Sequence, residues 1–77
     1  RLEDGLGSGK LKAPMDGAVV TIAVKEGDTV TRGQTVAVIE AMKMEHSIRA
    51  PADGVVRAVH VTPLQQVSSG ETLLELE

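Results

Sequence analysis

The chain has 77 residues, no cysteine, no aromatic side chain and a net charge of −3, which permits one small domain. Without cysteine, the sequence excludes disulfides, thiol nucleophiles and cysteine-ligated metal sites. The acidic balance and the lack of aromatic residues argue against a nucleic-acid partner. No apolar run approaches the roughly 18 residues needed to cross a membrane, so we expect no membrane partner, and no signal-peptide pattern is present.

The first nine residues, RLEDGLGSG, are polar, rich in glycine and without hydrophobic periodicity. This composition predicts a flexible linker or a cloning remnant over residues 1–9. Residues 10–77 are then expected to form the folded domain. Because the chain begins at Arg1 and not at Met, we expect it to be a segment of a longer polypeptide.

Short apolar segments, separated by glycine and proline about every ten residues, follow over residues 10–77. Eleven valines favour strands, and no segment keeps a 3.6-residue period across three turns, so helix is hard to place. The strands that we expect are 10–13, 18–24, 29–31, 34–41, 45–50, 55–61, 67–68 and 71–77.

An internal repeat organises these strands. Residues 13–40 align with residues 50–77 without a gap, at a constant offset of 37, and ten of the 28 aligned pairs are identical. Neither half, with about four short strands, can bury both of its faces alone. We therefore expect an all-β fold, in which the halves pack about a pseudo-two-fold axis around one shared core.

The segment 41–49 has no counterpart within the aligned pair and is predicted to form a hairpin with Met42 and Lys43 at its tip. Two-residue hairpin turns favour Asn-Gly or Asp-Gly, because the turn requires positive φ angles. Met-Lys is a poor choice for folding, which suggests that these side chains serve something else.

Lys43 has two interpretations. Most exposed lysines are merely solvated. Its place at the repeat junction and the methionines on both sides, Met42 and Met44, instead favour a lysine that is presented for modification. Lysine amines in general are neutral at pH 7 in fewer than about one molecule in a thousand. A modifying enzyme would therefore have to supply the base and the orientation, while this domain presents the nucleophile.

At these residues the chain resembles a known family. The run Ala41-Met42-Lys43-Met44 is similar to the biotin-attachment motif of biotin carboxyl carrier domains, in which the lysine is acylated by biotin. The resemblance covers residues 11–77, and the longer run EAMKMEH is most similar to the C-terminal domain of the biotin-containing alpha subunit of acyl-CoA carboxylases, of the methylcrotonyl-CoA or geranyl-CoA type. Further matching features are the turns 13–17 and 50–54, the loop 26–30 and the turn 32–34.

The resemblance implies a barrel-sandwich hybrid, a flattened β-barrel of two four-stranded antiparallel sheets with quasi-two-fold symmetry. It implies that biotin protein ligase attaches biotin to Lys43. The domain, not an enzyme by itself, would carry a carboxyl group from a biotin carboxylase domain to a carboxyltransferase subunit. It also implies a monomer when isolated, working in the bacterial cytoplasm or, in a eukaryote, the mitochondrial matrix.

Two alternatives and one departure accompany this resemblance. Lipoyl domains of 2-oxoacid dehydrogenase complexes share the fold, but their lysine commonly has Asp before it, whereas Met42 stands here. An unmodified barrel-sandwich module that mediates protein contacts is the third hypothesis. The chain has no insertion resembling the thumb of some bacterial carriers. The departure is the run 63–66, Pro-Leu-Gln-Gln, where relatives commonly have a glycine-containing acidic loop.

Other polar residues near the lysine carry weaker hypotheses. Glu40 and Glu45 flank the motif and could form a carboxylate pair or be recognised by the ligase, although the repeat counterpart of Glu40, Glu77, argues for a structural role. His46 is expected to face solvent rather than to touch the biotin ring. His60 is expected on the surface, and two histidines on different predicted strands argue against a metal site.

Overall fold

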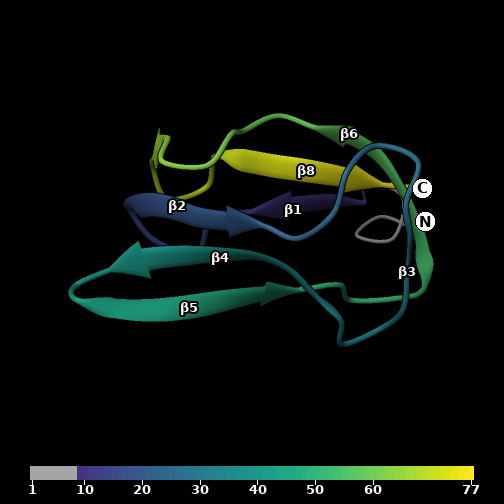
Figure 1. Cartoon of the computed structure of the whole chain (residues 1–77), viewed down its shortest axis with the longest axis horizontal. Helices are drawn as coiled ribbons and strands as arrows, with labels where there is room; N and C mark the ends of the chain where they lie inside the picture. The colour runs from purple at the N-terminus through teal and green to yellow at the C-terminus, as the bar shows by residue number, and fades with distance from the viewer. Residues whose placement is uncertain (1–8) are drawn as a thin grey trace.

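The computed structural model describes residues 9–77 and consists of two four-stranded sheets (Figure 1). All strand pairs are antiparallel, and residues 9–77 contain no helix and hence none that could span a membrane. One sheet has the strand order β1-β8-β6-β3, and the other has the order β5-β4-β2-β7. The strands are β1 (Lys10–Lys12), β2 (Gly17–Ile22), β3 (Thr29–Val30), β4 (Thr35–Ala41), β5 (Met44–Arg49), β6 (Gly54–Val59), β7 (Gln66–Val67) and β8 (Thr72–Leu76).

Both sheets mix the two halves of the repeat. Strands β1 and β3 of the first half lie with β6 and β8 of the second, while β2 and β4 lie with β5 and β7. Replacing every strand by the one four places along the chain converts one sheet into the other. The expected pseudo-two-fold arrangement and the all-β fold are therefore confirmed.

The hydrogen bonds between the halves repeat at the same offset. The N–H of Ala13 donates to the carbonyl of Glu71 at 2.9 Å, and the N–H of Ala50 donates to the carbonyl of Gln34 at 2.9 Å. The β-bulge in the pairing of β2 with β4, between Val19 and Thr21, has its equivalent between β6 and β8. The repeat thus fixes turns and bulges as well as strands.

The eight strands lie where the sequence predicts them, with ends that differ by one or two residues. The largest differences are at 18–24 and 55–61, whose strands end at Ile22 and Val59. Beyond these ends the chain leaves the sheet and crosses to β3 or β7 in the other sheet. Gly9, the last residue of the predicted linker, accepts a hydrogen bond from the N–H of Leu76 at 2.7 Å. The rest of that linker, 1–8, lies outside the described residues.

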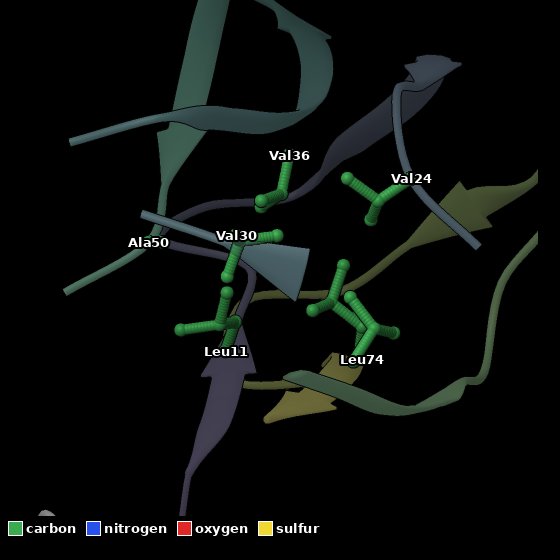
Figure 2. Close-up of a cluster of buried hydrophobic side chains, with 7 residues drawn as sticks. Leu11, Val24, Val30, Val36, Ala50 and Leu74 are labelled. Atoms are coloured by element: carbon green, nitrogen blue, oxygen red, sulfur yellow. The ribbon is translucent and has the colours of Figure 1, made fainter. Parts of the chain in front are cut away.

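The core lies between the sheets and consists of valine, leucine, isoleucine and alanine, as the composition predicts. One cluster, shown in Figure 2, contains Leu11, Val24, Val30, Val36, Ala50, Val56 and Leu74. A second cluster contains Ala13, Val19, Ile39, Val61, Val67 and Leu73. Ile48 packs against both clusters, so the hairpin strand β5 is fastened to the core along its second half.

Candidate attachment site

The hairpin of β4 and β5 has Met42 and Lys43 at its tip, as predicted. Both residues have positive φ angles, 55° and 65°, the left-handed pattern that a two-residue type I′ turn requires. Met42 is 88% exposed, and Lys43 is exposed as well. Left-handed backbone costs an L-residue about 1–2 kcal/mol. The tip is thus unfavourable for its residue types, and the strands below it must hold it in place.

Six residue pairs form the ladder below the tip, from Thr35 with Arg49 to Ala41 with Met44. Ala41 is buried, and β2 approaches it through Gly17. A Cβ on Gly17 would lie 2.6 Å from the carbonyl oxygen of Glu40 and 3.1 Å from the Cβ of Ala41. Only glycine therefore lets β2 come this close to the base of the hairpin.

The two faces of the hairpin differ in character. Glu40 and Glu45 lie directly opposite each other and are both exposed. Like charges in this position are destabilising, so the structure does bring these two carboxylates together at a cost. Over residues 9–77, no three histidine, aspartate or glutamate side chains are grouped so that they could hold a metal ion.

The position of His46 differs from the prediction made from the sequence. It pairs with Ile39, which is fully buried, and His46 itself is half-buried. Side chains alternate across a strand, so His46 lies with Met44 and Ile48 on the face turned toward the core. It was expected to face solvent, but the packing of Ile48 in the core fixes the register of β5 and turns His46 inward.

A shallow depression lies beside the tip. It is lined by Asp16, Gly17, Ala18, Glu40, Ala41, Met42, Lys43 and Gln66. The depression combines the lysine with two carboxylates and an amide, and it is open to solvent on one side. This domain therefore exposes an amine without enclosing a reaction chamber around it.

Asp16 is a site residue that the sequence reasoning did not single out. Its Oδ1 accepts a hydrogen bond of 2.7 Å from the N–H of Ser69. Asp53, the repeat counterpart, accepts one of 2.8 Å from the N–H of Arg32. The identity of the two aspartates in the repeat was the available signal, and their function in the fold is to tie turns of opposite halves together.

His60 lies outside the hairpin, in the second half of the repeat. It is on the surface, as expected, and its Nε2 lies 2.6 Å from Oε2 of Glu75. His46 is on β5 of one sheet, and His60 follows β6 of the other. The structure therefore does not bring the two histidines into one site.

Comparison with known proteins assigns this arrangement to a family. The model of the family described as biotin-requiring enzyme matches residues 9–76. The chain belongs to this family. It is 45% identical over 69 residues to the biotin carboxyl carrier protein of acetyl-CoA carboxylase from Solanum lycopersicum, covering 90% of this chain and 99% of that protein.

Larger relatives contain a similar region. The chain is 47% identical over 70 residues to the mitochondrial propionyl-CoA carboxylase alpha chain of Homo sapiens, covering 91% of this chain and 10% of that protein. This chain therefore spans about a tenth of that relative's length. The structure of a single-chain, multi-domain long-chain acyl-CoA carboxylase superimposes with a TM-score of 0.85 at 38% identity, covering 91% of this chain and 7% of that one.

The fold alone does not separate biotin from lipoate. The lipoyl domain of the 2-oxoglutarate dehydrogenase complex from Azotobacter vinelandii superimposes with a TM-score of 0.78 at 34% identity, covering 88% of this chain and 94% of that one. The carboxylase relatives, at 45% and 47% identity against 34% for the lipoyl domain, favour biotin. The chain is a biotin carboxyl carrier domain of biotin-dependent carboxylases, a carrier and not a catalytic domain.

Proposed function

We propose that Lys43 is the residue of this carrier domain that holds biotin, as an amide on its Nζ. The observation that carries the proposal is an exposed lysine at the strained tip of a hairpin whose base is buried. The motif of Ala41, Met42 and Met44 around it supports the same residue. Lys25, which is also exposed, lies in the loop after β2 and has no such setting.

The attachment requires a ligase, because the site contains no base that is held against the amine. In a biotin protein ligase, the neutral Nζ would attack the acyl carbon of biotinyl-adenylate. The new C–N bond forms, the bond to the adenylate oxygen breaks, AMP leaves, and the amine proton passes to a base of the ligase. The contribution of this domain is a nucleophile held on a rigid support.

Once attached, biotin supplies a ureido ring that can take up and release a carboxyl group. The residues of this chain provide its placement. The six-pair ladder and the contact at Gly17 hold the tip against the sheet, so the arm pivots at Lys43 while the domain remains rigid. The partners would be a biotin carboxylase domain and a carboxyltransferase subunit of an acyl-CoA carboxylase, and a tether would raise the effective concentration of biotin at both.

The residues around Lys43 would form the surface that the ligase recognises. Met42 and Met44 are 88% and 62% exposed and offer apolar contacts. Glu40 and Glu45 add an exposed acidic pair on the outer face of the hairpin. This surface fits a basic and apolar partner face. We place the reaction in a bacterial cytoplasm or in the mitochondrial matrix of a eukaryote.

The test is the intact mass of the chain, followed by peptide mapping, after incubation with biotin protein ligase, ATP and biotin. We expect one biotin, attached with loss of water, on the peptide that contains Lys43. Lys43→Arg should remain folded and gain no mass, because arginine stays protonated and cannot act as the nucleophile. Lys25→Arg, the matched control, should be modified like the wild type.

Three outcomes would contradict the proposal. Biotin on the Lys43→Arg chain would move the site to another lysine. A chain that gains no biotin but is modified by a lipoate ligase would be a lipoyl carrier, and a chain that neither ligase modifies would be an interaction module.

A further inference from the structure

The loop 62–65 has the same backbone as the loop 25–28 in the other half. In both, a side chain at the fourth position accepts the N–H of the first, at 3.0 Å: Gln65 for Thr62 and Asp28 for Lys25. In both, the third residue donates its N–H across to a core strand at 2.8 Å, from Leu64 to Val19 in one loop and from Gly27 to Val56 in the other. The departure of this loop from the family pattern therefore changes its residues and not its shape.

The third residue is where the two loops differ most. Gly27 has a φ of 94° and Leu64 has a φ of 74°, both in the left-handed region that favours glycine. Leu64 is also 84% exposed, so it gains little from packing. The positive φ angle at this position favours glycine, and the first half has glycine there, Gly27. Neither backbone geometry nor the core explains a leucine in the second half.

Leu64 shares both of its unfavourable features with the hairpin tip. Within residues 9–77, the positive φ angles outside glycine are at Met42, Lys43 and Leu64. The exposed large apolar side chains over the same range are Met42, Met44 and Leu64. Strain and exposed apolar surface thus coincide at two places, and one of them is the attachment site.

The two places lie at one end of the molecule. The hairpin tip and the yellow-green segment between β6 and β8, which contains the loop 62–65, both lie toward the left of Figure 1, while the chain ends are at the right. Ala18 on β2 pairs with Glu40 on one side and with Gln66 on the other. Strands lie about 4.8 Å apart, so Gln66 is roughly 10 Å from the hairpin strand, and it lines the same depression as Lys43.

We propose that Leu64 is a second apolar anchor for the biotin protein ligase, on the surface that surrounds Lys43. This proposal rests on the proposed function. Before modification, Lys43 reaches only about 6 Å beyond its Cα, so the ligase must press its active site against this end of the domain. A standard interface covers about 800 Å² per partner, more than the hairpin tip alone offers, and the loop 62–65 leads directly into Gln66, which lines the depression beside Lys43.

The chemistry of this end specifies the partner face. Leu64, Met42 and Met44 would each enter an apolar pocket on the ligase. The carboxylates of Asp16, Glu40 and Glu45, which surround Lys43 in the depression and on the hairpin, would meet basic side chains on the ligase. Aliphatic anchors surrounded by charge are a common arrangement of protein contacts.

The repeat provides a matched pair of variants. Leu64→Gly gives the second loop the residue that the first loop has. Gly27→Leu places a leucine in the equivalent loop between β2 and β3, which is bonded to β6 of the other sheet. We would measure kcat and KM for biotin attachment to each chain with ligase, ATP and biotin, and the urea midpoint of unfolding. For Leu64→Gly we expect an unchanged or higher midpoint, an unchanged kcat and a KM raised about tenfold.

For Gly27→Leu we expect a lower unfolding midpoint and the KM of the wild type, measured where the chain is folded. Leu64→Ala, which keeps the backbone strain but shortens the side chain, should raise KM like Leu64→Gly. A KM within about twofold of the wild type for both Leu64 variants would overturn the anchor while leaving Lys43 as the attachment site. A wild-type chain that takes up no biotin would overturn the proposed function and the anchor together.

Discussion

Asp16 and Asp53 occupy equivalent places in the two halves and bind across them in opposite directions. Asp16 accepts the N–H of Ser69, 53 positions away, and Asp53 accepts the N–H of Arg32, 21 positions away. Each bond joins the turn before a long strand to a turn of the other half. Only Asp16, however, lies in the depression beside Lys43. Comparing variants of the two aspartates therefore distinguishes an effect on folding from an effect at the site.

Replacing either aspartate by alanine should weaken the fold by a similar amount. A hydrogen bond to a carboxylate contributes about 1.5–3 kcal/mol when protected, and less at exposed positions, so we expect losses of about 1 kcal/mol for Asp16→Ala and Asp53→Ala in urea unfolding. Only Asp16→Ala should also slow biotin attachment. Equal slowing by Asp53→Ala would show that the effect comes from stability and not from the site.

Gly17→Ala should destabilise the base of the hairpin. Its new Cβ would lie 2.6 Å from a backbone oxygen and 2.8 Å from Cγ2 of Ile39, and such overpacking costs about 1–3 kcal/mol. Gly54→Ala, the repeat counterpart, meets one atom closer than 3.0 Å, the carbonyl oxygen of Glu77 at 2.8 Å, and its next contacts are at 3.8 Å or more. Urea unfolding should show the larger loss for Gly17→Ala, and an equal loss would contradict this account.

Met42→Asn should stabilise the domain. Asparagine tolerates a positive φ better than methionine does, so we expect a gain of about 0.5–1 kcal/mol in the free energy of unfolding. Biotin attachment should become less efficient, because an exposed apolar contact for the ligase is lost. Thermal or urea unfolding tests the first part, and a loss of stability would show that Met42 is not strained at the tip.

Stability should depend on pH through Glu75. The hydrogen bond from His60 lowers the pKa of Glu75 below its ordinary value of 4.5, and the charges of His60, Lys10 and Arg57 act in the same direction. A carboxyl with a lowered pKa in the folded state adds stability above pH 4.5 and loses it as the pH falls through the folded value. The wild type should therefore exceed Glu75→Gln in stability near neutral pH, and the difference should shrink in acid.

Urea unfolding at several pH values between about 2 and 7 would measure this difference. His60→Ala is the companion variant, since it removes the main cause of the shift and keeps the carboxyl. A gap between wild type and Glu75→Gln that stays constant over the whole range would exclude the ion pair as its source.

Much of the fold could be predicted because the same strand pattern occurs twice in the sequence, in residues 13–40 and 50–77. The repeat gave eight strands and a shared core, and the poor turn residues at Met42 and Lys43 marked the hairpin tip. The family motif then predicted biotin, which the comparisons confirmed for the family. Lys43 as the attachment residue remains a prediction until the modified chain is mapped.

Other features depend on the arrangement of strands in space. The inward position of His46 is established by the register of β5 against Ile39, although its alternation with Met44 and Ile48 along the strand was a signal for this face. The unusual loop at Leu64 keeps its shape through backbone hydrogen bonds and the side chain of Gln65, interactions that tolerate many residue types. The bonds of the two aspartates join turns that are remote in the chain, so local turn chemistry predicted the turns but not their contacts.

The mixing of halves in both sheets has a consequence for the order of events during protein synthesis. The core that supports the hairpin includes Leu73 and Leu74, which are fully buried and come from the last strand. A growing chain that has reached Arg49 already contains the whole hairpin but lacks these side chains and the strands beside them. Under the proposed function, the hairpin would present Lys43 to a ligase only after β8 has been synthesised and its leucines have entered the core. Biotin on Lys43 would then indicate that the domain has folded.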